Sequence, residues 1–292
     1  MVPTKKTLSL LLALTLVLTL SACGAKNETA SQPAAPQETV PAAETAEPVE
    51  IAVFAAASMQ ESLDEAITLY QAANPLVIVV PTYDSSGTLL KQIQAGAACD
   101  LFISAAPKQM NALDGSLKGD SEKNPDGLDY IVEGSRLNLL ENKVTLSVPE
   151  GNPAGIESFD QLAELLKSGE VMLAMGNSDV PVGQYTLKIF NYYGIDEAAV
   201  SGKLTYGSNV KEVTTQVIEG AVDCGIIYAT DAFSAGLTVV DGATAEMCGQ
   251  VIYPAAVLNC GEAPEAAQAF LDYLCTEEAL ACFRAVGFTP MV

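Results

Sequence analysis

The chain has 292 residues, 49% of them hydrophobic, which is enough to form one large core or two smaller ones. Its 14 Lys and Arg residues against 36 Asp and Glu give a formal net charge of −22, a balance that argues against binding to nucleic acid or to anionic lipid head groups. The sequence contains no histidine, which excludes Ser-His-Asp and Cys-His nucleophile pairs and every histidine-ligated metal site.

The N-terminus has the pattern of an export signal. Lys5 and Lys6 precede an apolar run over residues 8–20, and the motif LSAC ends at Cys23. This motif resembles a bacterial lipobox, which implies that residues 1–22 are a signal peptide and that the thiol of Cys23 carries lipid. An ordinary signal peptide with a chance cysteine is the alternative.

The segment after this motif has the composition of a linker. Residues 24–48 are rich in Ala, Pro, Glu and Thr and lack periodicity, so they cannot bury apolar surface. We therefore expect residues 23–48 to be a lipidated flexible tether. The folded domain would begin near Val49, outside the cell membrane and anchored to it by the lipid on Cys23.

Beyond the tether, short apolar runs alternate with amphipathic stretches, which predicts an α/β fold with mostly parallel sheets covered by helices. A polar insertion at 114–129 separates two such units, so two lobes are expected. The predicted strands cover 50–56, 76–83, 100–106, 143–149, 171–176, 203–207, 224–228 and 250–260, and the predicted helices cover 58–73, 86–96, 157–169, 182–194, 210–221 and two segments within 264–288.

Six further cysteines lie in the folded part, where an exported protein can keep disulfides. They are Cys99, Cys224, Cys248, Cys260, Cys275 and Cys282. Their pairing cannot be read from the sequence, because six thiols allow about fifteen connectivities. No CxxC pair occurs, so a bound metal cofactor is not expected, and small buried thiols are the commonest role for such residues.

Several of the predicted helices begin directly after a strand, in polar or Gly-containing turns. Ser58 ends the first strand, and the motif SMQE from Ser58 to Glu61 is typical of a capping box, which would be a purely structural role. Comparable junctions are SSG at 85–87, VPVG at 180–183 and SNV at 208–210.

These junctions favour an anion site. Open α/β sheets bind ligands beyond the carboxyl ends of their strands, where helix N-termini present unpaired N–H groups and the positive ends of their dipoles. No Lys or Arg lies within the junctions, so the donors would be neutral. Gly87 and Gly183 would let backbone approach the ligand, although turn geometry could also require them.

Longer motifs carry a resemblance to a known family. They are VFAAAS at 53–58, SSGTLLKQIQAGAACDLFISA at 85–105, VPVGQY at 180–185, CGIIYATDA at 224–232 and AVGFTP at 285–290. Together they resemble the molybdate-binding proteins of ABC importers, within the type II periplasmic-binding-protein superfamily. The resemblance covers residues 49–292.

The resemblance implies a set of ligand-binding residues. The family holds molybdenum as its oxyanion, through serine hydroxyls, main-chain amides and a tyrosine hydroxyl. Carried onto this sequence, the hydroxyls are those of Ser58, Ser86 and Tyr228, and the amides include those of Val182 and Val210. No catalytic residue and no cofactor is implied, and tungstate is an expected second ligand. Packing in a buried strand is the alternative role for Tyr228.

The resemblance also implies two lobes joined by a hinge of crossing strands. Residues 49–134 with 236–292 would form one lobe, and residues 135–235 the other. The ligand would bridge the lobes and favour their closure. A membrane permease with its ATPase would then receive the ligand from this protein, which we expect to act as a monomer.

Some features leave alternatives open. Asp84 directly precedes the SSG turn, and a carboxylate near the anion would suit phosphate, whose proton needs an acceptor, better than molybdate or sulfate. The direction of Asp84 is not readable from the sequence. Asp231 is expected to cap a helix. A sulfate- or phosphate-binding protein, an anion-sensing or adhesion receptor, and a serine hydrolase using Ser86 with Lys91 are the competing functions.

Overall fold

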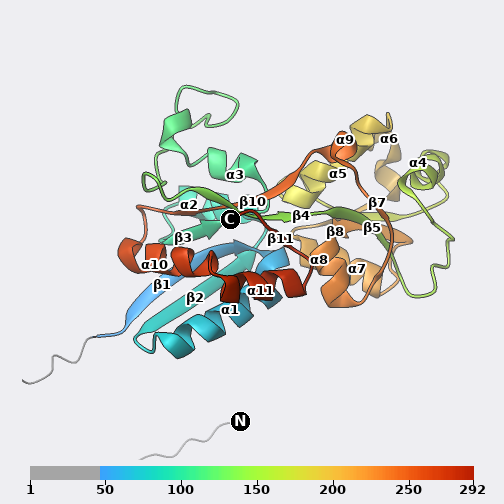
Figure 1. Ribbon diagram of the computed structural model, residues 1–292. Coiled ribbons are helices and arrows are strands. Elements are labelled where there is room, and N and C mark those ends of the chain that lie inside the picture. The colour runs from blue at the N-terminus through green and yellow to red at the C-terminus, as the bar shows by residue number, and fades with distance from the viewer. Residues whose placement is uncertain (1–46) are drawn as a thin grey trace, which may run out of the picture. The chain divides into compact units, whose positions relative to one another are not determined.

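The computed structural model describes residues 47–292, which form one compact unit. The predicted signal peptide, Cys23 and nearly all of the tether lie outside the described residues. Among the helices of this described part, none is both long and apolar enough to cross a membrane. Two sheets organise the unit, each flanked by helices as expected (Figure 1). Both sheets mix parallel and antiparallel pairs, whereas mostly parallel sheets are predicted from the sequence.

The first sheet has six strands in the order β11-β4-β10-β3-β1-β2. Strand β1 pairs in parallel with β2 and β3, whereas β10 and β4 run antiparallel to their neighbours. The parallel strands are thus confined to one half of the sheet. The bounds are β1 Val49–Ala56, β2 Val77–Asp84, β3 Leu101–Ile103, β4 Leu137–Asn142, β10 Val251–Val257 and β11 Thr289–Pro290.

The second sheet has five strands in the order β7-β6-β8-β5-β9. Strand β6 pairs in parallel with β7 and β8, and β5 pairs antiparallel with β8 and β9. It therefore repeats the first sheet's plan, with a parallel part and an antiparallel part. The bounds are β5 Val144–Val148, β6 Leu173–Gly176, β7 Leu204–Gly207, β8 Cys224–Tyr228 and β9 Thr238–Gly242.

Helices fill the connections between these strands. Those of the first lobe are η1 Ala57–Met59, α1 Gln60–Ala73, α2 Ser86–Gln94, α3 Pro107–Asn111, η2 Gly115–Leu117, α10 Pro264–Leu274 and α11 Glu277–Ala285. Those associated with the second sheet are α4 Phe159–Ser168, α5 Pro181–Tyr192, α6 Glu197–Val200, η3 Ser201–Lys203, α7 Val210–Ile218, α8 Ala229–Ala235 and α9 Ala245–Cys248.

Strand alternation explains how the first sheet is covered on both faces. Ile51 and Val53 of β1 face a core that includes residues of α1, α10 and α11. Phe54 points to the opposite face of the sheet, where it packs in a second cluster with Leu89 of α2 and Met110 of α3. Because both faces of the parallel strands are buried, β1 is a nearly continuous apolar run. That run is what made it predictable.

The chain crosses between the sheets at two places. Lys143 alone separates β4 from β5, and residues 243–250, which include α9, connect β9 to β10. The expected lobe boundaries, at 134/135 and 235/236, both precede these crossings in the chain. The reason is that β4 belongs to the first sheet and β9 to the second. Neither strand was predicted, since LNLLEN and TVVDG are short and mix polar with apolar residues.

Candidate functional site

Strand-to-helix junctions from both lobes meet at one small pocket. They are the starts of η1, α2, α5 and α7 together with the end of β8. The cavity volume is only about 10 Å³, about the space of one water molecule and far below that of a site for a drug-sized ligand. The lining residues, none of them cationic, are Ala56, Ala57, Ser58, Asp84, Ser85, Ser86, Ala105, Val180, Pro181, Val210 and Tyr228.

Ser58 lines this pocket, but it is not a helix cap. It lies inside η1, and the residue that precedes α1 is Met59, which makes no side-chain capping bond. The expected capping box with Glu61 is therefore wrong. The Ser58 hydroxyl instead lies 2.8 Å from Tyr253 Oη in the core. The side chain is 3% exposed, so the hydroxyl is held by tertiary structure rather than by its own helix.

Ser86 is the first residue of α2, and its neighbour Ser85 is the N-cap, accepting a hydrogen bond from the Thr88 N–H at 3.1 Å. The Ser86 hydroxyl accepts the backbone N–H of Ala105 at 2.9 Å. Since this bond uses a lone pair, the Ser86 proton stays available to donate into the pocket. The two adjacent serines therefore have different roles.

The expected amide donors lie in the first turns of α5 and α7. Val210 is the first residue of α7, after the N-cap Asn209, and it lines the pocket. Val182 is the second residue of α5 and is fully buried, but the residues that line the pocket there are Pro181 and the N-cap Val180. First-turn N–H groups have no intrahelical acceptor, so both helices present free donors at this end.

Tyr228 ends β8 and is 1% exposed. Its ring packs edge-on against those of Tyr185 and Tyr253, at centroid distances of 6.5 Å and 5.8 Å, so packing explains the ring. Packing does not explain the hydroxyl, which is buried and makes no well-formed hydrogen bond among the described residues, although the Tyr253 hydroxyl is near enough to act on its pKa. Burial raises the pKa of Tyr228 well above its ordinary value, so the phenol keeps its proton and is a donor.

Asp84 is the one charged residue that lines the pocket. Its Oδ1 accepts the backbone N–H of Ser85 at 2.7 Å and the Nδ2 of Asn209 at 3.4 Å. The second bond reaches across to the N-cap of α7 in the other lobe. The sequence left the direction of Asp84 open, and in the structure one carboxylate oxygen is committed to protein donors.

Two glycines are required here for a reason that the sequence did not reveal. A Cβ on Gly87 would lie 2.0 Å from the carbonyl oxygen of Asp179, which belongs to the other lobe. A Cβ on Gly183 would lie 2.2 Å from the carbonyl oxygen of Gly176, at the end of β6. Both glycines therefore admit protein backbone, a reason that adds to the two that the sequence leaves open, close approach to the ligand and turn geometry.

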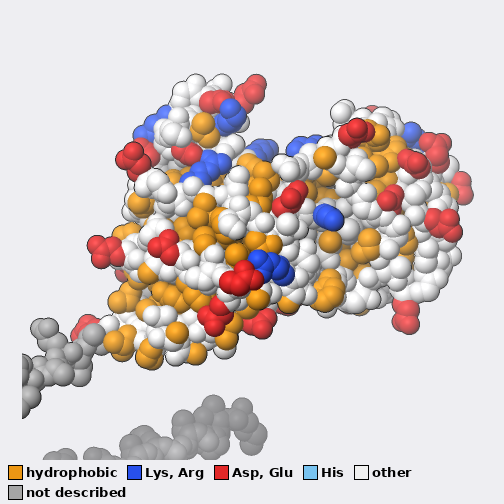
Figure 2. Space-filling view, in the orientation of Figure 1, with side chains coloured by type: hydrophobic (Ala, Val, Ile, Leu, Met, Phe, Trp, Pro, Cys, Tyr) orange, Lys and Arg blue, Asp and Glu red, His pale blue; other side chains and the backbone are white. Residues whose placement is uncertain are grey.

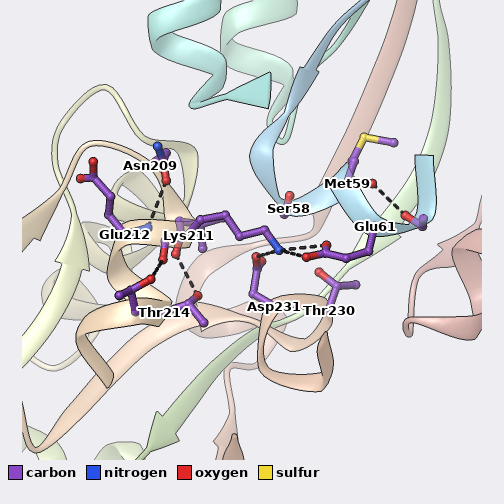
Figure 3. A network of polar contacts seen from close by, with 12 residues as sticks. Ser58, Met59, Glu61, Asn209, Lys211, Glu212, Thr214, Thr230 and Asp231 are labelled. Atoms are coloured by element: carbon purple, nitrogen blue, oxygen red, sulfur yellow. Dashed lines mark hydrogen bonds and ion pairs between the residues drawn. The ribbon is translucent and has the colours of Figure 1, made fainter. Parts of the chain in front are cut away.

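Ion pairs between the lobes surround the pocket. Lys211 of α7 contacts Glu61 of α1 at 2.7 Å and Asp231 of α8 at 3.4 Å (Figure 3). On another side, Lys91 of α2 contacts Asp179 at 2.5 Å. We call the pairs Lys211–Glu61 and Lys91–Asp179 the rim. The Lys91 contact also removes the basis for a hydrolase, because the lysine faces Asp179 rather than Ser86.

Asp231 is a buried ionisable residue, not a helix cap. It lies in the first turn of α8, whose N-cap is Tyr228, so the expected capping role is wrong. It is 1% exposed, and neither carboxylate oxygen has a hydrogen-bond partner among the described residues. Burial raises the pKa of Asp231 to about 7, although the nearby Lys211 acts in the opposite direction.

The described part of the chain has larger open clefts elsewhere, one of about 570 Å³ with Lys108, Lys123 and Lys188 in its lining, but it offers no metal or disulfide site. Within residues 47–292, no three His, Cys, Asp or Glu side chains are placed to hold a metal ion, and the six cysteines are free. On the face in Figure 2, acidic side chains are scattered rather than gathered in one patch.

Sequence reasoning missed two polar residues behind the pocket. Tyr253 of β10 contacts Ser58, and Asn142 at the end of β4 donates to Tyr253 Oη at 3.2 Å. Tyr253 lies in a predicted strand, but nothing in its pattern showed which face it would occupy. Asn142 lies in a strand that was not predicted at all.

Comparison with known proteins identifies the family. The model for bacterial extracellular solute-binding proteins matches residues 51–289. The chain belongs to this family. As a solute-binding protein it is not an enzyme, and the resemblance noted in the sequence is confirmed.

Individual relatives span nearly the whole domain. YvgL of Bacillus subtilis, a candidate ABC transporter substrate-binding lipoprotein, is 32% identical over 82% of this chain and 86% of its own. The Escherichia coli molybdate-binding protein ModA is 32% identical over 82% of this chain and 88% of its own. The solved substrate-binding domain of a candidate molybdenum ABC transporter from Clostridium difficile superposes with a TM-score of 0.60, at 26% identity, over 83% of this chain and 99% of that one.

Proposed function

We propose that this solute-binding protein captures molybdate between its two lobes, through the hydroxyls of Ser58, Ser86 and Tyr228 and the amides of Val182 and Val210. The observation that carries the proposal is the hydroxyl of Tyr228, a buried donor that no residue within 47–292 satisfies, at a pocket that helix N-termini surround. A buried polar group left unpaired costs about 1–3 kcal/mol, so a ligand that accepts its proton is the simplest reason for its presence. Relatives that carry the name molybdate-binding protein support the choice of anion.

The chemistry of the pocket favours an ion that only accepts hydrogen bonds. Molybdate and tungstate near neutral pH are bare acceptors with nearly the same size and charge, so neutral donors cannot separate them and we expect similar affinities. Sulfate is a smaller tetrahedron, and donors spaced for the larger ion would leave its oxygens with long or missing bonds. Phosphate carries a proton and needs an acceptor, and Asp84 is the candidate for that role.

Delivery completes the proposed role. The lipid on Cys23 would hold the protein at the outer face of the cell membrane, and the tether would let it reach a permease with its ATPase. The name of the relative YvgL, which includes the word lipoprotein, supports the anchor. We expect the protein to act as a monomer, since junctions from both lobes of one chain line the pocket.

Calorimetric titration of residues 26–292 with molybdate, tungstate, sulfate and phosphate tests the ligand. We expect similar affinities for molybdate and tungstate, and much weaker binding of sulfate. In a thermal melt, ligand at a hundred times its dissociation constant would add roughly 2.7 kcal/mol to the free energy of unfolding. Binding of phosphate alone would refute the molybdate assignment, and equimolar competition by sulfate would refute the size argument.

A further inference from the structure

A buried chain of polar groups runs from the crossing between the lobes to Ser58. It consists of Asn142, the last residue of β4, Tyr253 of β10 and Ser58 of η1. Asn142 Nδ2 lies 3.2 Å from Tyr253 Oη, and Tyr253 Oη lies 2.8 Å from Ser58 Oγ. All three residues are buried, with Tyr253 0% exposed. Water therefore does not compete for these bonds, and the direction of each bond matters.

The orientation of the Asn142 amide fixes the direction at the first step. Its Oδ1 accepts the backbone N–H of Lys143 at 2.8 Å, so the oxygen is assigned and the nitrogen must face the other way. The nitrogen donates to Thr230 Oγ1 at 2.9 Å as well as to Tyr253. Tyr253 Oη therefore accepts a hydrogen bond from Asn142.

The direction at the second step follows from counting protons. A tyrosine hydroxyl has one proton, and a buried one needs an acceptor for it. Ser58 Oγ, at 2.8 Å, is an acceptor within reach. If Tyr253 donates to Ser58, the one proton of Ser58 is left to point toward the pocket, and each bond polarises the next in the same direction.

We propose that Tyr253 and Asn142 are positioning residues for the bound oxyanion: they form a one-way donor chain, Asn142 to Tyr253 to Ser58, that directs the Ser58 proton at the ligand. The inference rests on the proposed function. It gives the site a reason to favour oxyanions that only accept hydrogen bonds, because a Ser58 that already accepts from Tyr253 has its proton free for the ligand. The donor chain begins where β4 passes into the second lobe, since Asn142 also donates a hydrogen bond to Thr230 of that lobe.

A double-mutant cycle between Tyr253 and Ser58 tests the chain, with molybdate affinity of residues 26–292 as the readout. Tyr253→Phe removes the hydroxyl and keeps the ring, and we expect it to weaken molybdate about threefold to tenfold, the range for one neutral hydrogen bond. Tyr253→Phe added to Ser58→Ala should weaken binding little further, because Tyr253 acts through Ser58. Tyr70→Phe, a buried tyrosine of α1 away from the pocket, is the matched control and should leave affinity unchanged.

The possible results are distinguishable. A wild-type protein that does not bind molybdate refutes the proposed function. A wild type that binds and loses affinity with Ser58→Ala, but shows either no effect of Tyr253→Phe or a fully additive one, overturns the donor chain alone. Because Tyr253→Phe could impair folding, Asn142→Leu provides a second cycle with Ser58→Ala. It removes the first donor, and we expect a non-additive loss of about twofold to fivefold. Additivity there would contradict the chain as well.

Discussion

The interior of the pocket and its rim are held by different kinds of interaction. The interior contains hydroxyls and helix amides, and the hydroxyls that we expect to contact the anion, those of Ser58, Ser86 and Tyr228, belong to side chains at most 3% exposed. The rim contains ion pairs whose side chains are 28% to 62% exposed. Apart from Asp84, which lines the pocket, neutral donors thus occupy the buried positions and charged groups the exposed ones.

Physical chemistry explains this division. A buried unpaired charge costs several kcal/mol in desolvation, whereas a neutral donor costs less and still pairs well with an ionised acceptor. An exposed ion pair loses little hydration when it forms, but it contributes only about 0–1 kcal/mol to stability. Affinity should therefore depend mainly on the interior, and the rim should adjust how readily the lobes close.

The largest expected effect is on an interior donor. Tyr228→Phe should weaken molybdate binding by roughly 1.5–3 kcal/mol, the scale for a hydrogen bond to a charged group. The ligand-free protein should be no less stable, because the lost hydroxyl has no protein partner. Titration and a ligand-free melt measure both quantities. Tyr192→Phe, at an exposed tyrosine, is the control. Unchanged affinity in Tyr228→Phe would show that the Tyr228 hydroxyl does not bind the ligand and that its side chain only packs.

The next effect concerns closure itself. Gly87→Ala places a methyl group against the Asp179 carbonyl of the other lobe, so the lobes cannot close fully. Overpacking of this kind costs about 1–3 kcal/mol, and affinity should fall roughly tenfold. The free energy of unfolding without ligand should fall by no more than this amount, since separation of the lobes relieves the clash.

Gly119→Ala, where a Cβ would meet nothing within 4 Å, is the matched control for this substitution. Equal affinities in the two variants would mean that ligand binding does not require the contact between Gly87 and Asp179.

Asp231 shares one property with each region: it is buried, as the interior residues are, and ionisable, as the rim residues are. Its pKa of about 7 exceeds the ordinary aspartate value near 4, so the folded state holds the proton more tightly than the unfolded state between those pH values. The free energy of unfolding should then fall as the pH rises through this window, by up to about 1.4 kcal/mol per pH unit, and level off above pH 7.

Melts from pH 5 to 8 measure that slope, and Asp231→Asn should remove its contribution. Lys211 and Glu61 are the charged groups nearest to Asp231, and Tyr228 and Tyr253 are the phenols around it. Parallel pH curves for the variant and the wild type would contradict the raised pKa.

The smallest expected effect is at the rim. Glu61→Gln removes the partner of Lys211 across the lobes, and affinity should fall by about 0.2–1 kcal/mol at low salt and by less at high salt, as screening predicts. Glu65→Gln, one turn along the same helix, is the control. A loss as large as that of Tyr228→Phe would show that the rim, not the interior, dominates binding.

Much of this arrangement was predictable from local patterns. Strand β1 and helices such as α4 follow directly from apolar periodicity, and α4 also has Ser158 as its N-cap and Gly169 as a left-handed C-cap. The pocket junctions were predicted because each is a short polar or glycine-containing turn between two periodic segments. Strands β4 and β9 were missed because they are short and mixed, and pairing with distant strands stabilises them.

Sequence alone therefore determined the α/β class, the helix N-termini that line the pocket, and the absence of histidine chemistry and of cations at the junctions. These properties depend on residues close together in the chain. Only the tertiary structure decided that Ser58 bonds Tyr253 instead of capping its helix, that Asp84 reaches Asn209, and that Gly87 faces Asp179. Each of these contacts joins residues far apart in sequence, and their alternatives differ by about one hydrogen bond, so no local pattern can choose between them.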